Sequence, residues 1–204
     1  MRQVAIKKMS YWTQLASRFL RRDEGSAILE FALTLPLLVV FVVGIYDFSG
    51  AFNQKQKLAQ GTQEGAIVAG GQPTSDIVVG NANPDSLQPV VAAVFNSLAG
   101  SGVLPLAGTG SCKTTPPPVP VPGSGLSWTY TFTGCSGSFP GDVLTIAINR
   151  GSATTTAPIA VSTSVTVAYP YHWRFNSVIQ LLFPGANYAA VTNLSESATV
   201  HNQT

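Results

Sequence analysis

The side chains that most often carry out chemistry are scarce in this chain. Its 204 residues include two histidines, His172 and His201. His172 lies in the sequence YPYHWRF, next to aromatic residues and close to Arg174, so a structural aromatic patch is a simpler interpretation than a catalytic site. No Gly-x-Ser-x-Gly motif, phosphate-binding glycine loop or metal-binding histidine pair occurs in the sequence. The sequence therefore predicts a protein that is not an enzyme and that needs no metal or cofactor.

Two cysteines, Cys112 and Cys135, are the remaining candidates for reactive groups. They lie among Gly, Ser and Thr residues, and neither has a second Cys or a His nearby at the spacing of metal ligands. A disulfide fits better than a zinc site, provided that the compartment is oxidising. The bridge would close a loop of about 24 residues and stabilise the fold by on the order of 3 kcal/mol.

One carboxylate, Glu30, lies inside a long apolar segment. Residues 26–46 read SAILEFALTLPLLVVFVVGIY, and Glu30 is their only charged residue. A helix of this length spans about 31 Å, close to the thickness of the hydrocarbon core of a bilayer. A removed signal peptide is the alternative, although its apolar region is shorter and is followed by a small-residue cleavage site. The segment therefore predicts one membrane-spanning helix, in which the bilayer itself is a partner.

The charges on either side of this segment predict its orientation. Residues 1–25 carry six basic and two acidic side chains, whereas the rest of the chain carries five basic and seven acidic ones. The positive-inside rule therefore places residues 1–25 in the cytoplasm and the remainder on the outer side of the membrane. The leader either lies along the inner leaflet as a basic amphipathic helix or is a basic tail that only sets topology. Because the body is not basic, nucleic-acid binding is not expected.

The pattern beyond residue 46 predicts an α+β protein. Charged residues make up 10% of the chain, well below the usual share of about 25% in a soluble domain, which favours an extracytoplasmic or assembly-embedded protein. The helix turns polar without a break and is expected to continue to about Val68, since no proline occurs before Pro73. We therefore expect a leader at 1–25, a spanning helix at 26–46, a helical extension at 47–70 and an extracytoplasmic domain at 71–204.

Within that domain, the sequence predicts one helix and a short sheet. Residues 84–98 show helical spacing of apolar side chains, with Asn83 as a cap and Pro84 at the first position, although Pro89 limits this helix. The proline-rich segment 114–123 is expected to form an extended surface loop. Alternating apolar and polar residues predict three antiparallel strands, and the tail after Gly185 is expected to cover their sheet. The three predicted strands are residues 128–132, 144–149 and 161–167.

The sequence at the start of the apolar helix, RRDEGSAILEFALTLPLLVVFVVGIYDF, resembles a known pattern. A Gly that follows charged residues, with a Glu five residues later, is similar to type IV prepilins and pseudopilins. The fuller match resembles the TadE-like family of the tight-adherence (Flp) pilus machinery, over about residues 23–68. It consists of Glu24-Gly25, Glu30-Phe31-Ala32-Leu33, Leu35-Pro36, Gly44 and Gln63-Glu64-Gly65-Ala66.

The resemblance implies a processing site and a set of partners. A prepilin peptidase would cut between Gly25 and Ser26, which makes Glu30 the fifth residue of the mature chain. A carboxylate about 6 Å inside an apolar segment is costly unless it has a partner, and the new α-ammonium of Ser26 could supply one. Glu30 would then serve assembly, although it could instead reach the headgroups alone. Ser26 is a departure, because mature pilins often begin with an aromatic residue.

Two functions follow as expectations. The resemblance implies a non-enzymatic minor pilin, pseudopilin or assembly factor of TadE, TadF or TadG type. Its partners would be other pilin-like subunits and the inner-membrane assembly platform, and it could enter the pilus. The alternative is a periplasmic binding domain, unrelated to pili, that uses the helix only as a membrane tether.

Overall fold

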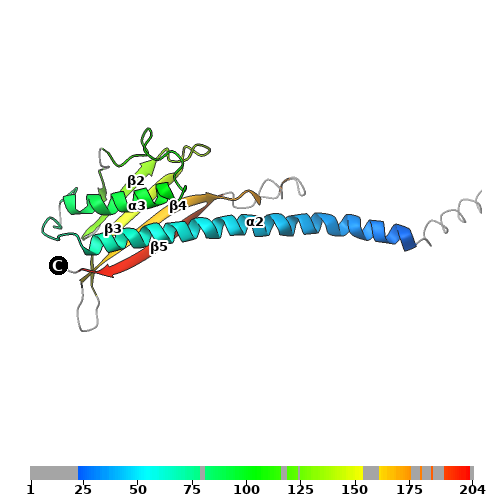
Figure 1. Ribbon diagram of the computed structural model, residues 1–204, viewed down its shortest axis with the longest axis horizontal. Coiled ribbons are helices and arrows are strands. Elements are labelled where there is room, and N and C mark those ends of the chain that lie inside the picture. The colour runs from blue at the N-terminus through cyan, green and yellow to red at the C-terminus, as the bar shows by residue number, and fades with distance from the viewer. Residues whose placement is uncertain are drawn as a thin grey trace, which may run out of the picture.

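The computed structural model describes residues 23–78, 81–115, 119–123, 125–153, 161–175 and 191–202, together with positions 180 and 185. The conformation predicted for the leader at residues 1–22 lies outside these ranges. One half of a long helix projects from the molecule, and the other half packs with a second helix on an antiparallel sheet (Figure 1). The predicted α+β fold class is therefore confirmed.

The long helix, α2, runs from Asp23 to Gly70 without interruption and contains Pro36. Its continuation past the apolar segment is as predicted, and its end lies close to the expected position at Val68. The helix stops where two glycines, Gly70 and Gly71, follow each other and lower helix propensity. Residues 26–46 are almost entirely exposed, whereas one face of the following half is buried from Asp47 onward.

The second helix begins later than the sequence predicts. A short 3-10 helix, η1 (Asp85–Leu87), precedes α3 (Gln88–Gly100), and no side chain caps either element. The expected Asn83 cap is therefore wrong. Pro89 lies in the first turn of α3, where a missing N–H costs nothing, so it marks the start of this helix and does not limit it. The buried face is the predicted one: Val90, Val91, Val94, Phe95 and Leu98.

Over the residues that the structure describes, the sheet has five strands and not three. Its order follows the chain, β1-β2-β3-β4-β5, and every neighbouring pair is antiparallel. The three predicted strands are present but longer. The proline-rich loop contributes a two-residue edge strand, and the tail expected to cover the sheet joins its other edge. The strands are β1 (Val121–Pro122), β2 (Ser127–Thr133), β3 (Val143–Ala153), β4 (Val161–His172) and β5 (Val191–His201).

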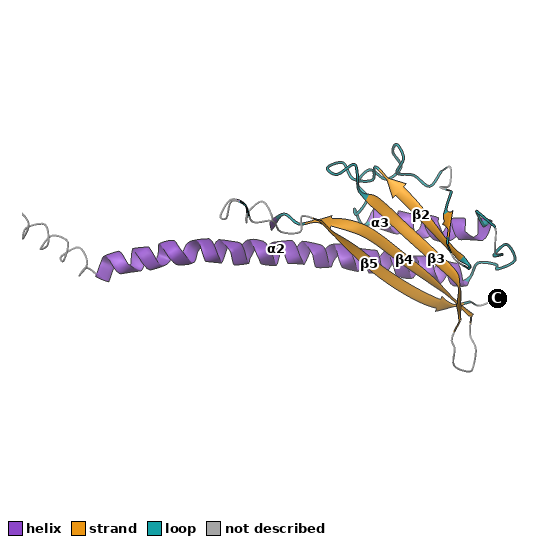
Figure 2. Cartoon of the chain, turned by 180° about the vertical axis from the view of Figure 1, so that it is seen from behind, coloured by secondary structure: helices purple, strands orange, loops and turns teal. Residues whose placement is uncertain are grey.

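The core lies between one face of the sheet and the two helices, and Figure 2 shows the opposite, open face. Alternate residues of β2, β3 and β4 point into this core, as period-2 patterning requires. Phe132 of β2 and Phe95 of α3 meet there with ring centroids 5.1 Å apart. The strand residues of the core are Trp128, Tyr130, Phe132, Leu144, Ile146, Ile148, Val165, Val167 and Tyr169.

Small residues let α2 approach α3 closely. A Cβ added to Gly61 would lie 3.2 Å from Leu98 Cδ2, and one added to Gly65 would overlap Val94. Ala66 and Ala69 continue this face and are buried. The glycines that weaken α2 as an isolated helix are therefore the residues that allow its packing.

Replacing Gly65 by alanine is expected to destabilise the protein by about 1–2 kcal/mol. The added methyl must push Val94 aside, which outweighs the gain in helix propensity. Gly100→Ala is the matched control, because nothing lies within 4 Å of its added Cβ, and a neutral or slightly stabilising effect is expected. Denaturant unfolding of the full chain in detergent measures both. Stabilisation by both substitutions would contradict the packing described.

The two cysteines are joined in the structure. The Cys112–Cys135 bridge connects residues 23 positions apart, and both side chains are fully buried. It ties the loop after α3 to the turn after β2, next to the main-chain hydrogen bond from Leu106 N–H to Cys135 O. A bridge over such a loop stabilises by on the order of 3 kcal/mol.

Candidate functional site

The projecting half of α2 is apolar around its whole circumference. Its best membrane-length window has a mean hydropathy of 2.6, and none of that window is buried within the molecule. A helix with no polar face has no side suited to water, so it requires lipid or the apolar surfaces of other helices. In the part of the chain that the structure describes, α2 is the one helix long and apolar enough to cross a membrane, and it can do so once.

The predicted processing and assembly residues lie close together in the N-terminal part of α2. Gly25 and Ser26 belong to α2, and Glu30 follows Ser26 by about one turn on the same face. Among the described residues, Glu30 forms no ion pair. Figure 1 shows the N-terminal half of α2 projecting far from the sheet domain, so this segment, which contains Glu30, can meet groups outside its own domain. Cys112 and Cys135 belong to the sheet domain and take no part in this site.

Asp47 forms the junction between the apolar half of α2 and the sheet domain. It is the first charged residue after the span, yet its relative exposure is only 2%. Tyr171 Oη lies 2.9 Å from Asp47 Oδ1 and donates to this residue, while the main-chain N–H of Phe175 donates to Oδ2 at 2.8 Å. A buried carboxylate is costly without such donors, and here both oxygens are satisfied.

The next two turns of α2 continue this junction. A Cβ on Gly50 would lie 2.5 Å from Tyr171 Oη, so the absence of a side chain admits the hydroxyl. Gln54 Nε2 donates to the carbonyl oxygen of Pro170 at 3.2 Å. Burial, together with the hydrogen bond to Asp47, raises the pKa of Tyr171 to about 12, so the hydroxyl remains a donor at neutral pH. The end of β4 is thus held against residues 47–54.

The aromatic patch predicted around His172 is present at this junction. Trp173 meets Phe48 edge-on at 5.2 Å and Tyr171 at 5.1 Å between ring centroids. Trp173 Nε1 also donates to Thr192 Oγ1 of β5 at 2.7 Å. Trp and Tyr favour the interface between membrane and water, where one end of the ring is apolar and the other is wet. The patch therefore lies where the apolar span ends.

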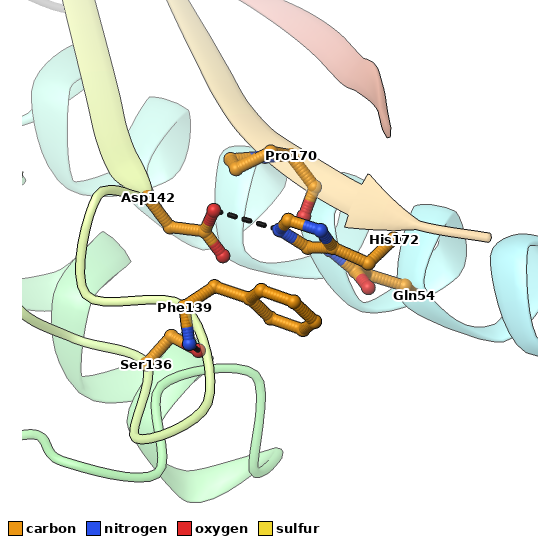
Figure 3. A network of polar contacts seen from close by, with 6 residues as sticks. All are labelled: Gln54, Ser136, Phe139, Asp142, Pro170 and His172. Atoms are coloured by element: carbon orange, nitrogen blue, oxygen red, sulfur yellow. Dashed lines mark hydrogen bonds and ion pairs between the residues drawn. The ribbon is translucent and has the colours of Figure 1, made fainter. Parts of the chain in front are cut away.

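His172 itself takes part in a packing contact. Its Nε2 is 2.7 Å from Asp142 Oδ1, and its ring stacks on Phe139 with centroids 3.4 Å apart (Figure 3). The main-chain N–H of Phe139 donates to Ser136 Oγ, which fixes the turn that carries Phe139. These contacts tie the turn before β3 to the end of β4. No group of three metal-binding side chains occurs among the residues that the structure describes.

The opposite end of α2 is held by Arg150, whose relative exposure is 2%. Its guanidinium donates to the carbonyl oxygens of Ala69, Gln72 and Pro73, the last two at 2.9 and 3.2 Å. A cation at this position complements the negative end of the helix dipole. Burial lowers the pKa of Arg150, and the nearby carboxylate of Asp76 acts in the opposite direction. The domain half of α2 is therefore fixed at both ends, by Asp47 and by Arg150.

Most of α2 matches a known protein family. Residues 25–66 match the family model described as TadE-like protein, starting at the glycine of the predicted processing site. No curated protein and no solved structure matches the chain. The family is associated with Tad/Flp pilus systems. The predicted resemblance to the TadE-like family is thus confirmed for residues 25–66, about a fifth of the chain.

Proposed function

We propose that this chain is a non-enzymatic minor pilin, pseudopilin or assembly factor of a Flp-type pilus system. It crosses the bacterial inner membrane once, with its N-terminus in the cytoplasm and its sheet domain in the periplasm. The observation that carries the proposal is the continuity of α2: an apolar half exposed on every side runs without a break into a half held by the sheet domain.

This continuity favours assembly over simple tethering. Asp47 and Arg150 fix α2 to the sheet, so the helix and the domain move as one body. If such a body leaves the bilayer, the apolar half must be covered by the apolar helices of neighbouring subunits. A tether needs only a flexible connection between helix and domain. The alternative, a membrane-tethered periplasmic binding domain, does not explain why Asp47 holds the helix rigidly against the domain.

Processing prepares the helix end for this role. In our proposal, a prepilin peptidase cuts between Gly25 and Ser26, which lie in α2 just before the apolar segment. The new α-ammonium of Ser26 then pairs with Glu30, of the same chain or of a neighbour, and sets the register between subunits. The other partners are pilin-like subunits, the inner-membrane assembly platform and the bilayer.

Photo-crosslinking in the native host tests this proposal. A photoreactive phenylalanine analogue replaces Phe41, which lies in the apolar half and is 62% exposed. Phe139, which is 44% exposed in the sheet domain, is the matched control. We expect adducts of position 41 with pilin-like subunits, well above those of position 139. Adducts of position 41 with lipid alone would contradict the proposal and favour the tether.

A further inference from the structure

A groove lies beside the junction of α2 with the sheet domain. Its volume is about 440 Å³. Tyr46, Asn53 and Lys57 line it from α2, and Val103 lines it from the loop after α3. Tyr171 and Arg174 close it from the end of β4 and the segment that follows. The groove therefore begins where the apolar span ends and follows the helix into the domain.

The charged side chains that line this groove are both basic. They are Lys57 and Arg174, and within the described part of the chain neither forms an ion pair. The nearby carboxylates are already engaged. Asp47 accepts hydrogen bonds from Tyr171 and Phe175, as described above. Asp142 pairs with His172, and Glu196 pairs with Lys55 at 3.2 Å. The groove is thus suited to an anion.

The height of the groove relative to the membrane indicates which anion it can meet. Tyr46 is the last residue of the apolar span, and the headgroup layer extends about 5–8 Å beyond the hydrocarbon core. At 1.5 Å per residue, Gly50 lies about 6 Å above Tyr46 and Lys57 about 16 Å above it. The mouth of the groove therefore opens within the headgroup layer, and the aromatic patch with Trp173 lies at the same level. The negative groups present there are lipid phosphates.

We propose that this groove binds the phosphate-bearing headgroup of an anionic phospholipid. Arg174 supplies a planar guanidinium that matches a phosphate with two parallel hydrogen bonds, and Lys57 supplies a second positive charge deeper in the groove. Asn53 and Tyr46 offer polar groups to the hydroxyls of a glycerol headgroup. The bound lipid fixes the rotation of the sheet domain relative to the membrane. This inference rests on the membrane span of the proposed function.

The test uses the full chain in lipid nanodiscs of phosphatidylcholine mixed with phosphatidylglycerol. Native mass spectrometry counts the lipids that each protein retains. Wild type is expected to retain phosphatidylglycerol in preference to phosphatidylcholine. In the double variant Lys57→Gln, Arg174→Gln, the ratio of retained phosphatidylglycerol to phosphatidylcholine is expected to fall by on the order of tenfold. Lys55→Gln is the matched control, since it removes a neighbouring cation that is paired with Glu196 and does not line the groove.

Three outcomes would overturn the inference. Equal loss with Lys55→Gln would mean general attraction to an anionic surface. Full displacement of the lipid by soluble glycerol phosphate would mean a site for a free phosphate. Wild type without any lipid preference would mean no site. Circular dichroism in pure phosphatidylcholine verifies that the variants are folded. Extraction by alkaline carbonate separates the two proposals, because loss of the wild-type chain from the membrane contradicts the span itself.

Discussion

Replacing Arg150 by methionine is expected to lower the free energy of unfolding by about 3 kcal/mol or more. The guanidinium is buried and satisfies three carbonyl groups at the end of α2, and hydrogen bonds to a charged group are each worth about 1.5–3 kcal/mol before compensation. Methionine fills a similar volume but removes the guanidinium donor from all three carbonyls, and of these Ala69 O still accepts from the main-chain N–H of Gln72 at 3.2 Å. It also removes the positive charge that faces Asp76.

The effect of Arg150 can be separated from that of losing any basic residue. Lys113 is exposed, and Lys113→Met is expected to change stability by no more than about 0.5 kcal/mol. Arg150→Lys should fall between, because it keeps the charge but cannot reach three carbonyls with one ammonium. Denaturant unfolding followed by tryptophan fluorescence measures all three, since Trp128 is buried in the same core. Equal effects of the two methionine variants would rule out the capping role.

Replacing Glu30 by glutamine is expected to reduce the recovery of pilin-like partners by about tenfold or more, in line with the loss of a charge pair inside a membrane. The substitution keeps the volume and removes the charge that would pair with the α-ammonium of Ser26. Insertion should be equal or easier, because the cost of desolvating the carboxylate disappears. The stability of the sheet domain should not change, since Glu30 lies on the projecting half of α2, far from the core.

Co-purification from the native host at matched protein levels measures this loss. Glu64→Gln is the control, because Glu64 is also an exposed glutamate of α2 within the TadE-like segment, but lies on the half that packs with the sheet domain. Cleavage should survive in both variants, since the scissile bond is about one helical turn from Glu30. Normal partner recovery and normal piliation with Glu30→Gln would reduce this residue to one that reaches the headgroups alone.

The elements with a strong local period could be predicted from the sequence. The apolar run fixed α2, and the alternation of apolar and polar residues located β2, β3 and β4. The strand β5 was missed because its inward positions include Thr192 and Glu196, which blur the alternation. Pro89 was misjudged because a proline in the first turn of a helix and one in its interior look alike until the start of the helix is known.

The contacts that fix α2 to its domain could not be predicted. Asp47 meets Tyr171 across 124 positions of sequence, and Arg150 meets Ala69 across 81. No local sequence pattern predicts such pairs, because the two partners lie in elements that are far apart in the sequence. The contact face of α2 also lacks an apolar stripe, since Gly61 and Gly65 contribute through the absence of a side chain. By contrast, Gly25 and Glu30 could be proposed from the sequence, because the pattern that they form depends only on their spacing along one helix.

The N-terminal sequence of the protein extracted from membranes of its native host tests the central proposal most directly. A pilin-like subunit that is processed for assembly should begin at Ser26, with a free α-amine, and its intact mass should lack residues 1–25. A mature chain of this kind places Glu30 next to the new ammonium. A chain that retains Met1 in a host with an active prepilin peptidase would contradict the pilin-like function and leave α2 as a membrane tether.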